Sequence, residues 1–308
     1  MKILIGYDGS DCAEAALDDL TRAGLPSRAE AIVLSVAEVW LPPPPSSFEF
    51  LEGTAEVQIP DEPRYAKAKA KAESALAEAQ QAQHRLQTNF PRWHVSAESA
   101  VGSPAWEIVA RADEWKPALL VVGSHGRSAL GRLVLGSVAQ RVVTEARCSV
   151  RVARGRVDEP NSAVRLIVGL DGSFGSETTI REVARRSWPN KSEVRLIVAS
   201  DPIPATIMGQ VIPAITSVID ETNRAERIRI ETILARAQGI LRNSGLAIST
   251  RVEEGDPKKV LIAAAEEFAA DCIFVGSTGT SNRLERFVMG SVAASIVGRA
   301  HCSVEVVR

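Results

Sequence analysis

The feature that most constrains this chain of 308 residues is that it repeats itself. The segment KILIGYDGS, at residues 2–10, returns as RLIVGLDGS at 165–173. Each copy also ends alike, with RCSVRVAR at 147–154 and HCSVEVVR at 301–308. A repeat of this length is a duplicated domain rather than a solenoid of short units, and the chain is long enough for two ordinary domains. We expect domains at 1–154 and 164–308, joined by a polar linker at 155–163.

Each copy alternates apolar strands with helices. Continuous apolar runs such as KILIGY and ALLVVG are typical of strands that are covered on both faces. Residues 62–87, rich in Ala, Glu, Lys and Gln, indicate a long surface helix. Strands that alternate with helices favour a parallel sheet. We therefore predict an α/β fold of two tandem doubly wound domains, each a five-stranded, mostly parallel sheet with helices on both faces.

Composition and charge limit the partners of the chain. Its formal net charge of −2 argues against a broad basic face, and so against nucleic acid as the main partner. Asp8 comes too early for the apolar core of a signal peptide, and no apolar run approaches the roughly 20 residues of a membrane span. The scattered cysteines favour reduced thiols over disulfides or a zinc site; they are Cys12, Cys148, Cys272 and Cys302. We expect a cytoplasmic protein without a nucleic-acid or membrane partner.

The stretch VVGSHGRSALGRLVLGS, at residues 121–137, places glycines directly after a predicted strand. Gly123 and Gly126 remove side chains and permit positive φ, so that backbone amides can approach an anion. Ser137 begins the next helix, whose N-terminal amides and dipole favour phosphate. Ligands of open parallel sheets bind beyond the carboxyl ends of the strands. The stretch, which recurs at 275–291, therefore indicates a phosphate site; the alternative is that its glycines only shape a turn.

Other phosphate-binding motifs fit this chain less well. Gly126 and Gly131 have the spacing of a P-loop, but Arg132 and Leu133 follow where Lys and Ser or Thr are required. No GxGxxG motif follows a strand, and the SGGxDS signature of the PP-loop enzymes is absent. These observations argue against a P-loop NTPase, a dinucleotide-binding Rossmann site and a PP-loop enzyme.

Asp-Gly-Ser after the first strand, together with G-x2-G-x9-G-S after the fourth, resembles the universal stress protein family. The resemblance covers both halves, apart from the linker and an LPPPPSS insert at 41–47. It implies a fold like that of the adenine nucleotide alpha hydrolases. In the ATP-binding branch it also implies adenine near strands one and two, with phosphates on the glycine loop. ATP is therefore the expected cofactor, and Asp8 and Asp171 are candidates to help hold Mg²⁺ beside its phosphates.

The same resemblance suggests the site residues. Asp8 would lie by the adenosine, and Val36, at the end of strand two, would offer its backbone to the adenine. The triphosphate would lie on Gly123, Gly126, Gly136 and Ser137, with Val138 adjoining. The matching residues of the second half are Asp171, Ala199, Gly276, Gly279, Gly290, Ser291 and Val292.

The two glycine loops differ in length. Nine residues, 127 to 135, lie between Gly126 and Gly136, whereas ten, 280 to 289, lie between Gly279 and Gly290. Phosphate contacts need amides placed to within about half an ångström. We therefore expect the first site to bind ATP at least as well as the second.

The last strand of each half suggests how the halves assemble. Members of the resembled family commonly form homodimers through this strand. We therefore expect the two halves to pair with each other inside one chain, and a further homodimer remains open. Cys148 and Cys302 are expected to be core residues of these strands rather than redox switches.

Two classes of function remain open. The favoured one is a nucleotide-dependent stress-response or signalling module, whose ATP-loaded and empty forms differ in affinity for an unknown protein partner. The rival is a slow ATP hydrolase or nucleotidyl-transfer enzyme on the same fold, and a third reading is a scaffold that binds no nucleotide. No catalytic residue is assigned: His125 lies in a polar loop where the second copy has Thr278, and Ser10 and Ser137 have no evident base.

Overall fold

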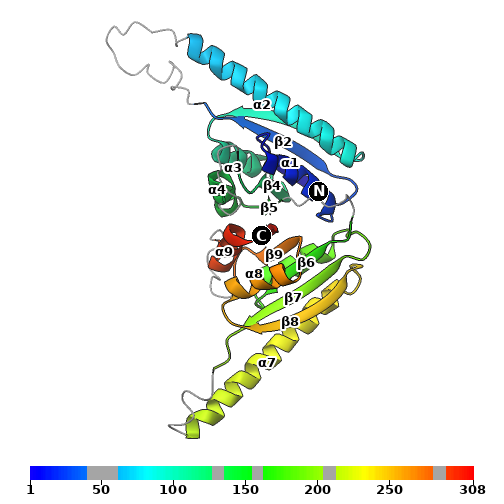
Figure 1. Cartoon of the computed structure of the whole chain (residues 1–308), viewed down its shortest axis with the longest axis vertical. Helices are drawn as coiled ribbons and strands as arrows, with labels where there is room; N and C mark the ends of the chain where they lie inside the picture. Colours follow the sequence, from blue (N-terminus) through cyan, green and yellow to red (C-terminus); the bar gives the residue numbers. More distant parts are fainter. Residues whose placement is uncertain (40–61, 127–134, 155–161, 204–212, 280–288) are drawn as a thin grey trace, which may run out of the picture.

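The structure is a computed structural model of the chain, and it describes residues 1–39, 62–126, 135–154, 162–203, 213–279 and 289–308 (Figure 1). The LPPPPSS insert at 41–47 lies outside the described residues, as does most of the linker at 155–163. In both halves the predicted alternation of strands and helices is confirmed.

The elements of the first half are, in chain order, β1 (Lys2–Gly6), α1 (Asp11–Asp19), η1 (Leu20–Arg22), β2 (Glu30–Ala37), α2 (Glu62–Asn89), β3 (His94–Val101), α3 (Pro104–Trp115), β4 (Leu119–Gly123), α4 (Ser137–Glu145) and β5 (Ser149–Ala153). Those of the second half are β6 (Arg165–Leu170), α5 (Phe174–Ala184), β7 (Glu193–Ser200), α7 (Pro213–Leu241), β8 (Ala247–Glu254), α8 (Pro257–Glu267), β9 (Cys272–Gly276), α9 (Ser291–Arg299) and β10 (Ser303–Val307).

The two halves share one continuous sheet. Its ten strands follow the order β3-β2-β1-β4-β5-β10-β9-β6-β7-β8. Neighbouring strands are parallel within each half, as predicted, and β5 and β10 pair antiparallel where the halves meet. The intramolecular pairing expected from the last strands is therefore present in the structure.

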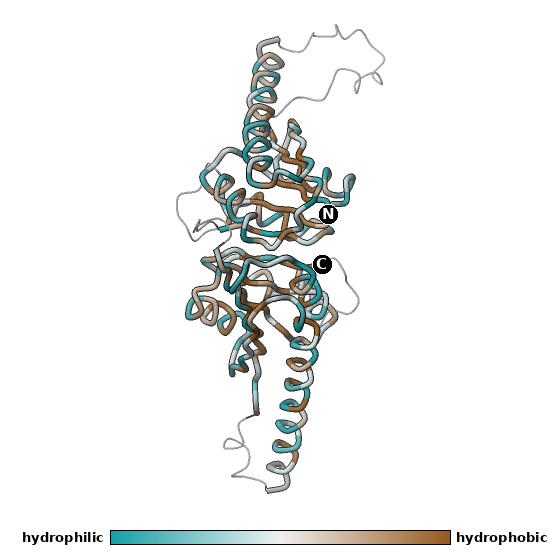
Figure 2. Tube along the Cα trace, turned by 90° about the vertical axis from the view of Figure 1, so that its right-hand side faces the viewer, coloured by the Kyte–Doolittle hydropathy of each residue, from teal (hydrophilic) through white to brown (hydrophobic). Residues whose placement is uncertain are grey.

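Helices cover both faces of this sheet (Figure 1). On one face, α3, α4, α8 and α9 bury a single apolar cluster that includes Leu120 and Val143 of the first half and Ile273 and Ile296 of the second. On the other face each half has its own cluster, under α1 and α2 in the first and under α5 and α7 in the second. Figure 2 shows hydrophobic segments gathered in the interior of both halves. On this face of the sheet, the apolar core therefore continues from one half into the other.

The turn after the first strand of each half is built in the same way. Gly9 and Gly172 have positive φ, 68° and 77°, which glycine adopts without steric cost. The hydroxyl of the next residue, Ser10 or Ser173, then accepts a hydrogen bond from the amide three residues further on. These serines are therefore the N-caps that begin α1 and α5.

Two long helices, α2 and α7, extend away from the centre of the molecule at opposite ends of its long axis (Figure 1). Both are largely polar on their outer surfaces, as the sequence of the first one predicts. In the part of the chain that the structure describes, no helix is long and apolar enough to cross a membrane.

The contact between the halves, which we name the seam, consists of β5, β10 and the loops at 23–27 and 186–190. Its centre is charged and buried. Arg151 contacts Asp19, with 2.5 Å between Nε and Oδ2, and also Glu305, with 3.1 Å between Nη1 and Oε2. Arg186 in turn donates to Glu305 and Glu182. Because buried charges are costly unless they are paired, this chain of ion pairs depends on both halves being present.

The arginine that ends each half also reaches the other half. Arg154 donates to the carbonyl of Val297 in α9, and Arg308 donates to the carbonyl of Val143 in α4. Burial lowers the pKa of both guanidinium groups. A cation near the carboxyl end of a helix is favourable because the last carbonyls lack partners within the helix.

The seam generates a stability prediction at Gly24, whose φ is +65° and whose carbonyl accepts a hydrogen bond from the amide of Ser187. A Cβ added at Gly24 would lie 2.9 Å from the ring of Trp188. We expect Gly24→Ala to lower the free energy of unfolding by about 2 to 5 kcal/mol, since it combines backbone strain with overpacking. Urea denaturation measures the change.

The matched control is Gly239→Ala, in α7, where an added Cβ meets nothing within 4 Å. Because alanine is the better helix former, this variant should gain roughly 1 kcal/mol. Equal effects of the two substitutions would contradict the packing described at Gly24.

Candidate functional site

The second half has a cavity of about 270 Å³ where β6, β7 and β9 end and α9 begins. Every residue that the sequence suggested for the second site lines it. These residues are Asp171, Ala199, Gly276, Gly279, Gly290, Ser291 and Val292. The structure thus brings the whole second set together, although ligand binding by these residues stays a prediction.

The lining of this cavity combines apolar and polar groups. Ile197, Leu261 and Val275 supply apolar side chains, whereas Asp171 and several hydroxyl groups supply polar ones. The hydroxyl groups belong to Ser173, Ser176, Thr278 and Ser291. An apolar concavity with a few polar groups is typical of a small-molecule site.

The glycines of the second loop allow three chain segments to touch. A Cβ on Gly276 would lie 2.8 Å from the carbonyl carbon of Gly175, and one on Gly279 would lie 2.9 Å from Oδ2 of Asp171. The amide of Gly290 donates to the carbonyl of Ser277 at 2.7 Å. A side chain at Gly276 would push the end of β9 away from the backbone of α5, and one at Gly279 would displace the Asp171 carboxylate.

The first half repeats this geometry. A Cβ on Gly123 would lie 2.9 Å from the carbonyl oxygen of Cys12, and one on Gly126 would lie 2.9 Å from Oδ2 of Asp8. The amide of Gly136 donates to the carbonyl of Ser124 at 2.8 Å. The structure therefore brings Asp8 and the three glycines together, as the sequence suggested.

The remaining candidates of the first half lie on neighbouring elements. Ser137 and Val138 begin α4 directly after Gly136, and Val36 lies near the end of β2, packed against the common apolar cluster. Most of the two loops whose lengths differ, at 127–134 and 280–288, lies outside the described residues. The expected order of affinity of the two sites therefore stays a prediction.

One reason given for these glycines was wrong. Positive φ was expected to be useful at Gly123 and Gly126, but neither is among the glycines with positive φ. At Gly123 the need for glycine comes instead from the close approach of the backbone of α1, whereas at Gly126 an added Cβ would meet the end of the Asp8 side chain. The constraint is steric contact between segments rather than an unusual backbone conformation.

The two aspartates are held by the turns in which they lie. Oδ1 of Asp8 accepts hydrogen bonds from the amide and the hydroxyl of Ser10, at 3.1 and 2.6 Å. Oδ1 of Asp171 accepts one from the amide of Ser173 at 2.9 Å. Across the described ranges, no group of three or more His, Cys, Asp or Glu residues gathers to hold a metal ion. Mg²⁺ beside a bound phosphate stays a prediction.

Each site contains the start of a helix. Both α4 and α9 have a glycine as N-cap, Gly136 or Gly290, which offers no side-chain acceptor to the first amides. The next residues, Ser137 and Ser291, are exposed. Uncapped amides at a helix N-terminus, together with the helix dipole, favour an anion.

His125 differs from what its polar loop indicates. The sequence favours a solvated side chain, but only 9% of it is exposed. Nδ1 lies 2.8 Å from the hydroxyl of Ser124, and Nε2 is buried without a hydrogen-bond partner in the described structure. Burial, and then the positive charge of Arg154, lowers the pKa of the imidazole. No local signal in the sequence predicts this burial.

Of the cysteines near the last strands, Cys302 is buried in the common apolar cluster and Cys148 is partly buried against it. Cys148 and Cys302 lie one residue before β5 and β10 rather than within them. Burial raises the pKa of the Cys148 thiol to about 11 and that of Cys302 to about 12. Since the thiolate is the reactive form, neither site suits a redox switch.

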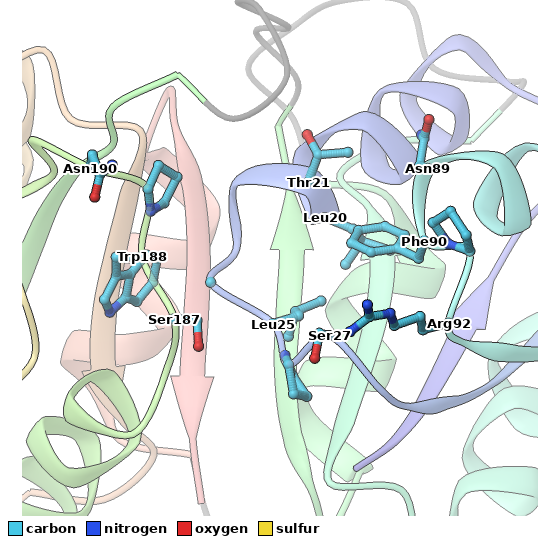
Figure 3. Close-up of a pocket in the computed structure, with 14 residues that line it drawn as sticks. Leu20, Thr21, Leu25, Ser27, Asn89, Phe90, Arg92, Ser187, Trp188 and Asn190 are labelled. Atoms are coloured by element: carbon cyan, nitrogen blue, oxygen red, sulfur yellow. The ribbon is translucent and has the colours of Figure 1, made fainter.

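A second cavity, of about 740 Å³, lies along the seam and was not anticipated from the sequence. Figure 3 shows Trp188 and Asn190 of the second half across from Leu25, Phe90 and Arg92 of the first. None of the residues suggested for nucleotide binding lines it. The cavity is a product of the assembly of the two halves.

The comparisons with known proteins agree with this architecture. A family model described as the universal stress protein family matches residues 1–154 and 164–308. A universal stress protein of Methanocaldococcus jannaschii is 39% identical over 79 residues, which is 25% of this chain and 46% of that protein. The chain thus spans about half the length of the curated relatives that it matches.

Two solved structures show the same fold over the full chain. A universal stress protein from Archaeoglobus fulgidus has a TM-score of 0.61 at 19% identity, covering 100% of this chain and 98% of its own. A functionally unknown protein from Pseudomonas aeruginosa has a TM-score of 0.54 at 14% identity, covering 99% of this chain and 92% of its own.

The buried imidazole generates a pH prediction. Because the pKa of His125 is lower in the folded chain than the usual 6.5, its contribution to stability is present above that value. The contribution is lost as the pH falls through the lowered pKa, since the unfolded chain then binds the proton more readily. We expect the free energy of unfolding to fall between pH 8 and pH 5 by more in the wild type than in His125→Asn.

Urea denaturation at each pH measures this difference, and His84→Asn, at an exposed position in α2, is the control. The control should keep the wild-type dependence on pH. If the free energy of unfolding falls equally in the wild type and in His125→Asn on acidification, the titration of His125 does not contribute to the loss of stability.

Proposed function

The chain belongs to the universal stress protein family, and we propose that each half binds ATP at the carboxyl end of its strands. In this proposal the protein is a nucleotide-dependent stress-response or signalling module. Its ATP-loaded and empty forms differ in affinity for a protein partner.

The observation that carries the proposal is the cavity of the second half. All seven residues suggested from the sequence line it, although they come from four separate segments of the chain. Turn-forming glycines alone would not require these segments to surround a common space. The convergence supports a ligand site over a motif retained only for its turn.

The chemistry of the lining suits a nucleotide. The apolar side chains of Ile197 and Leu261 would pack against adenine, and the Asp171 carboxylate would accept hydrogen bonds from ribose hydroxyls. The uncapped amides of α9 and the hydroxyl of Ser291 would donate to phosphate oxygens. A bound Mg²⁺ would supply further positive charge beside the phosphates.

The first half supports a second site of the same kind. Oδ2 of Asp8 lies 2.9 Å from the position of a Cβ added at Gly126, and Oδ2 of Asp171 lies 2.9 Å from that of a Cβ added at Gly279. The loops of the two sites differ in length and in sequence, and His125 of the first half lies where the second half has Thr278. We propose that both sites bind ATP and that their affinities are unequal.

Binding and turnover are separate questions. A binding module retains ATP in a stoichiometric complex, whereas the rival hydrolase or nucleotidyl-transferase releases product with time. Incubating the purified full-length protein with radiolabelled ATP and Mg²⁺ distinguishes them. Retained ATP without product supports the proposed module, and multiple turnovers by the pure protein would assign the enzymatic alternative.

The binding proposal predicts a selective loss in Ser137→Ala and Ser291→Ala. Each substitution removes one hydrogen bond to a charged group, worth roughly 1.5 to 3 kcal/mol. The affinity of the altered site for ATP should therefore fall about tenfold to a hundredfold. Adenosine has no phosphate, so its weaker binding should change little. Isothermal titration calorimetry with both ligands measures these affinities.

The matched control is Ser187→Ala, which changes an exposed serine of the second half that lies on the seam and should leave both affinities unchanged. The phosphate role fails if ATP and adenosine weaken equally in the folded Ser137 and Ser291 variants. ATP that does not bind to the wild type at all would reject the proposed function.

A further inference from the structure

The two strands that join the halves carry opposite charges at equivalent positions. Arg151 in RCSVRVAR corresponds to Glu305 in HCSVEVVR. These two residues are also directly paired with each other across β5 and β10. A position that faces its own equivalent lies on the pseudo-twofold axis that relates the two halves. The duplicated sequence thus has a cation on this axis in one copy and an anion in the other.

Both charges are removed from water. The side chain of Arg151 is 2% exposed and that of Glu305 is 0% exposed, and Nη1 lies 3.1 Å from Oε2. Each group also has a charged partner in its own half, Asp19 for Arg151 and Arg186 for Glu305. Among the described residues, the contact between Arg151 and Glu305 joins these two pairs across the strands. The axis therefore contains an ion pair whose members come from different halves.

A second asymmetry lies next to the axis. Counted from the two Asp-Gly-Ser turns, Ala23 of the first half is equivalent to Arg186 of the second. Nη1 of Arg186 donates to the carbonyl of Ala23 at 2.9 Å, and Nη1 also donates to Glu305 at 3.0 Å. In a pair of two second halves, the position of Ala23 would be taken by the Arg186 of the other copy.

We propose that the seam is a selective interaction surface, on which each half accepts the other half and rejects a second copy of itself. Two first halves would place two Arg151 guanidinium groups directly opposite each other. Two second halves would place two Glu305 carboxylates there, with two Arg186 side chains beside them. Like charges directly opposite in paired strands are destabilising, and burial increases the cost. Asp19 and Arg186 offset part of the charge within each half but leave the contact on the axis repulsive.

The selectivity has a consequence for function. A homodimer of single domains must have two identical sites, whereas a pair that forms only between unlike halves always contains one site of each kind. The site with His125 and the site with Thr278 therefore occur in a fixed one-to-one ratio within one unit. The partner that fits either edge strand is the other half of this chain, from the same copy or from a second one.

The test begins with the folded full-length protein, in which a protease site placed within residues 155–161 allows the linker to be cut. Unlabelled and isotopically labelled cut protein are mixed in urea and returned to buffer, and the pairs are counted only if pairs with one labelled and one unlabelled half show that the halves exchanged. Native mass spectrometry counts the pairs, since the two halves differ in mass. We expect the mixed pair to exceed each like pair at least tenfold, where random pairing would give a twofold excess.

The matched control is the double variant Arg151→Gln, Glu305→Gln, cut and treated in the same way. Its axis carries no charge, so its like pairs should rise toward the random proportion. The wild-type count stands even if this variant does not fold. Random pairing of the wild-type halves would overturn the proposal, and so would halves that separate without forming pairs.

Discussion

The antiparallel pairing of β5 with β10 is the constraint on which the rest of the structure depends. Without it each half would expose the edge of a five-stranded sheet, and unpaired edges are prone to association. The pairing converts two sheets into one and places α3, α4, α8 and α9 over a common apolar cluster. It also buries the ion pairs around Arg151 and Glu305, which neither half could satisfy in the same way alone. The two candidate sites are thereby parts of one unit.

Within each half, close packing at glycines gives the candidate site its shape. The glycines at the ends of β4 and β9 approach the backbone of α1 and α5 at distances that a Cβ would not permit, and the glycines at the starts of α4 and α9 leave little room for one. In the second half the result is a cavity lined by Asp171, the glycines and Ser291. The same contacts recur in the first half, although His125 is buried there where the second has Thr278. The glycine contacts are therefore the same in the two copies, whereas a side chain next to them differs.

The seam shows the same division between preserved and altered positions. The valines that flank Arg151 and Glu305 are retained in both strands, and each of them pairs with a valine of the other strand. The charge on the axis and the residue at position 23 or 186 differ between the copies. A duplicated chain can change such positions because each copy needs to match only the other, whereas a homodimer must match itself.

The sequence by itself determined the duplication and the order of strands and helices, and its resemblance to a known family suggested the residues that line the cavity of the second half. The duplication and the order of elements follow from local patterns, because apolar runs mark buried strands, and Asp-Gly-Ser and the glycine loop mark turns at the carboxyl ends of strands. Only the tertiary structure decided that His125 is buried, that Arg151 faces Glu305, and that a cavity lies along the seam beside Trp188. The charge pairing and the cavity depend on segments that are far apart in the chain. Which side chains become buried or paired depends on which distant segments come into contact, and no local pattern of residues specifies those contacts.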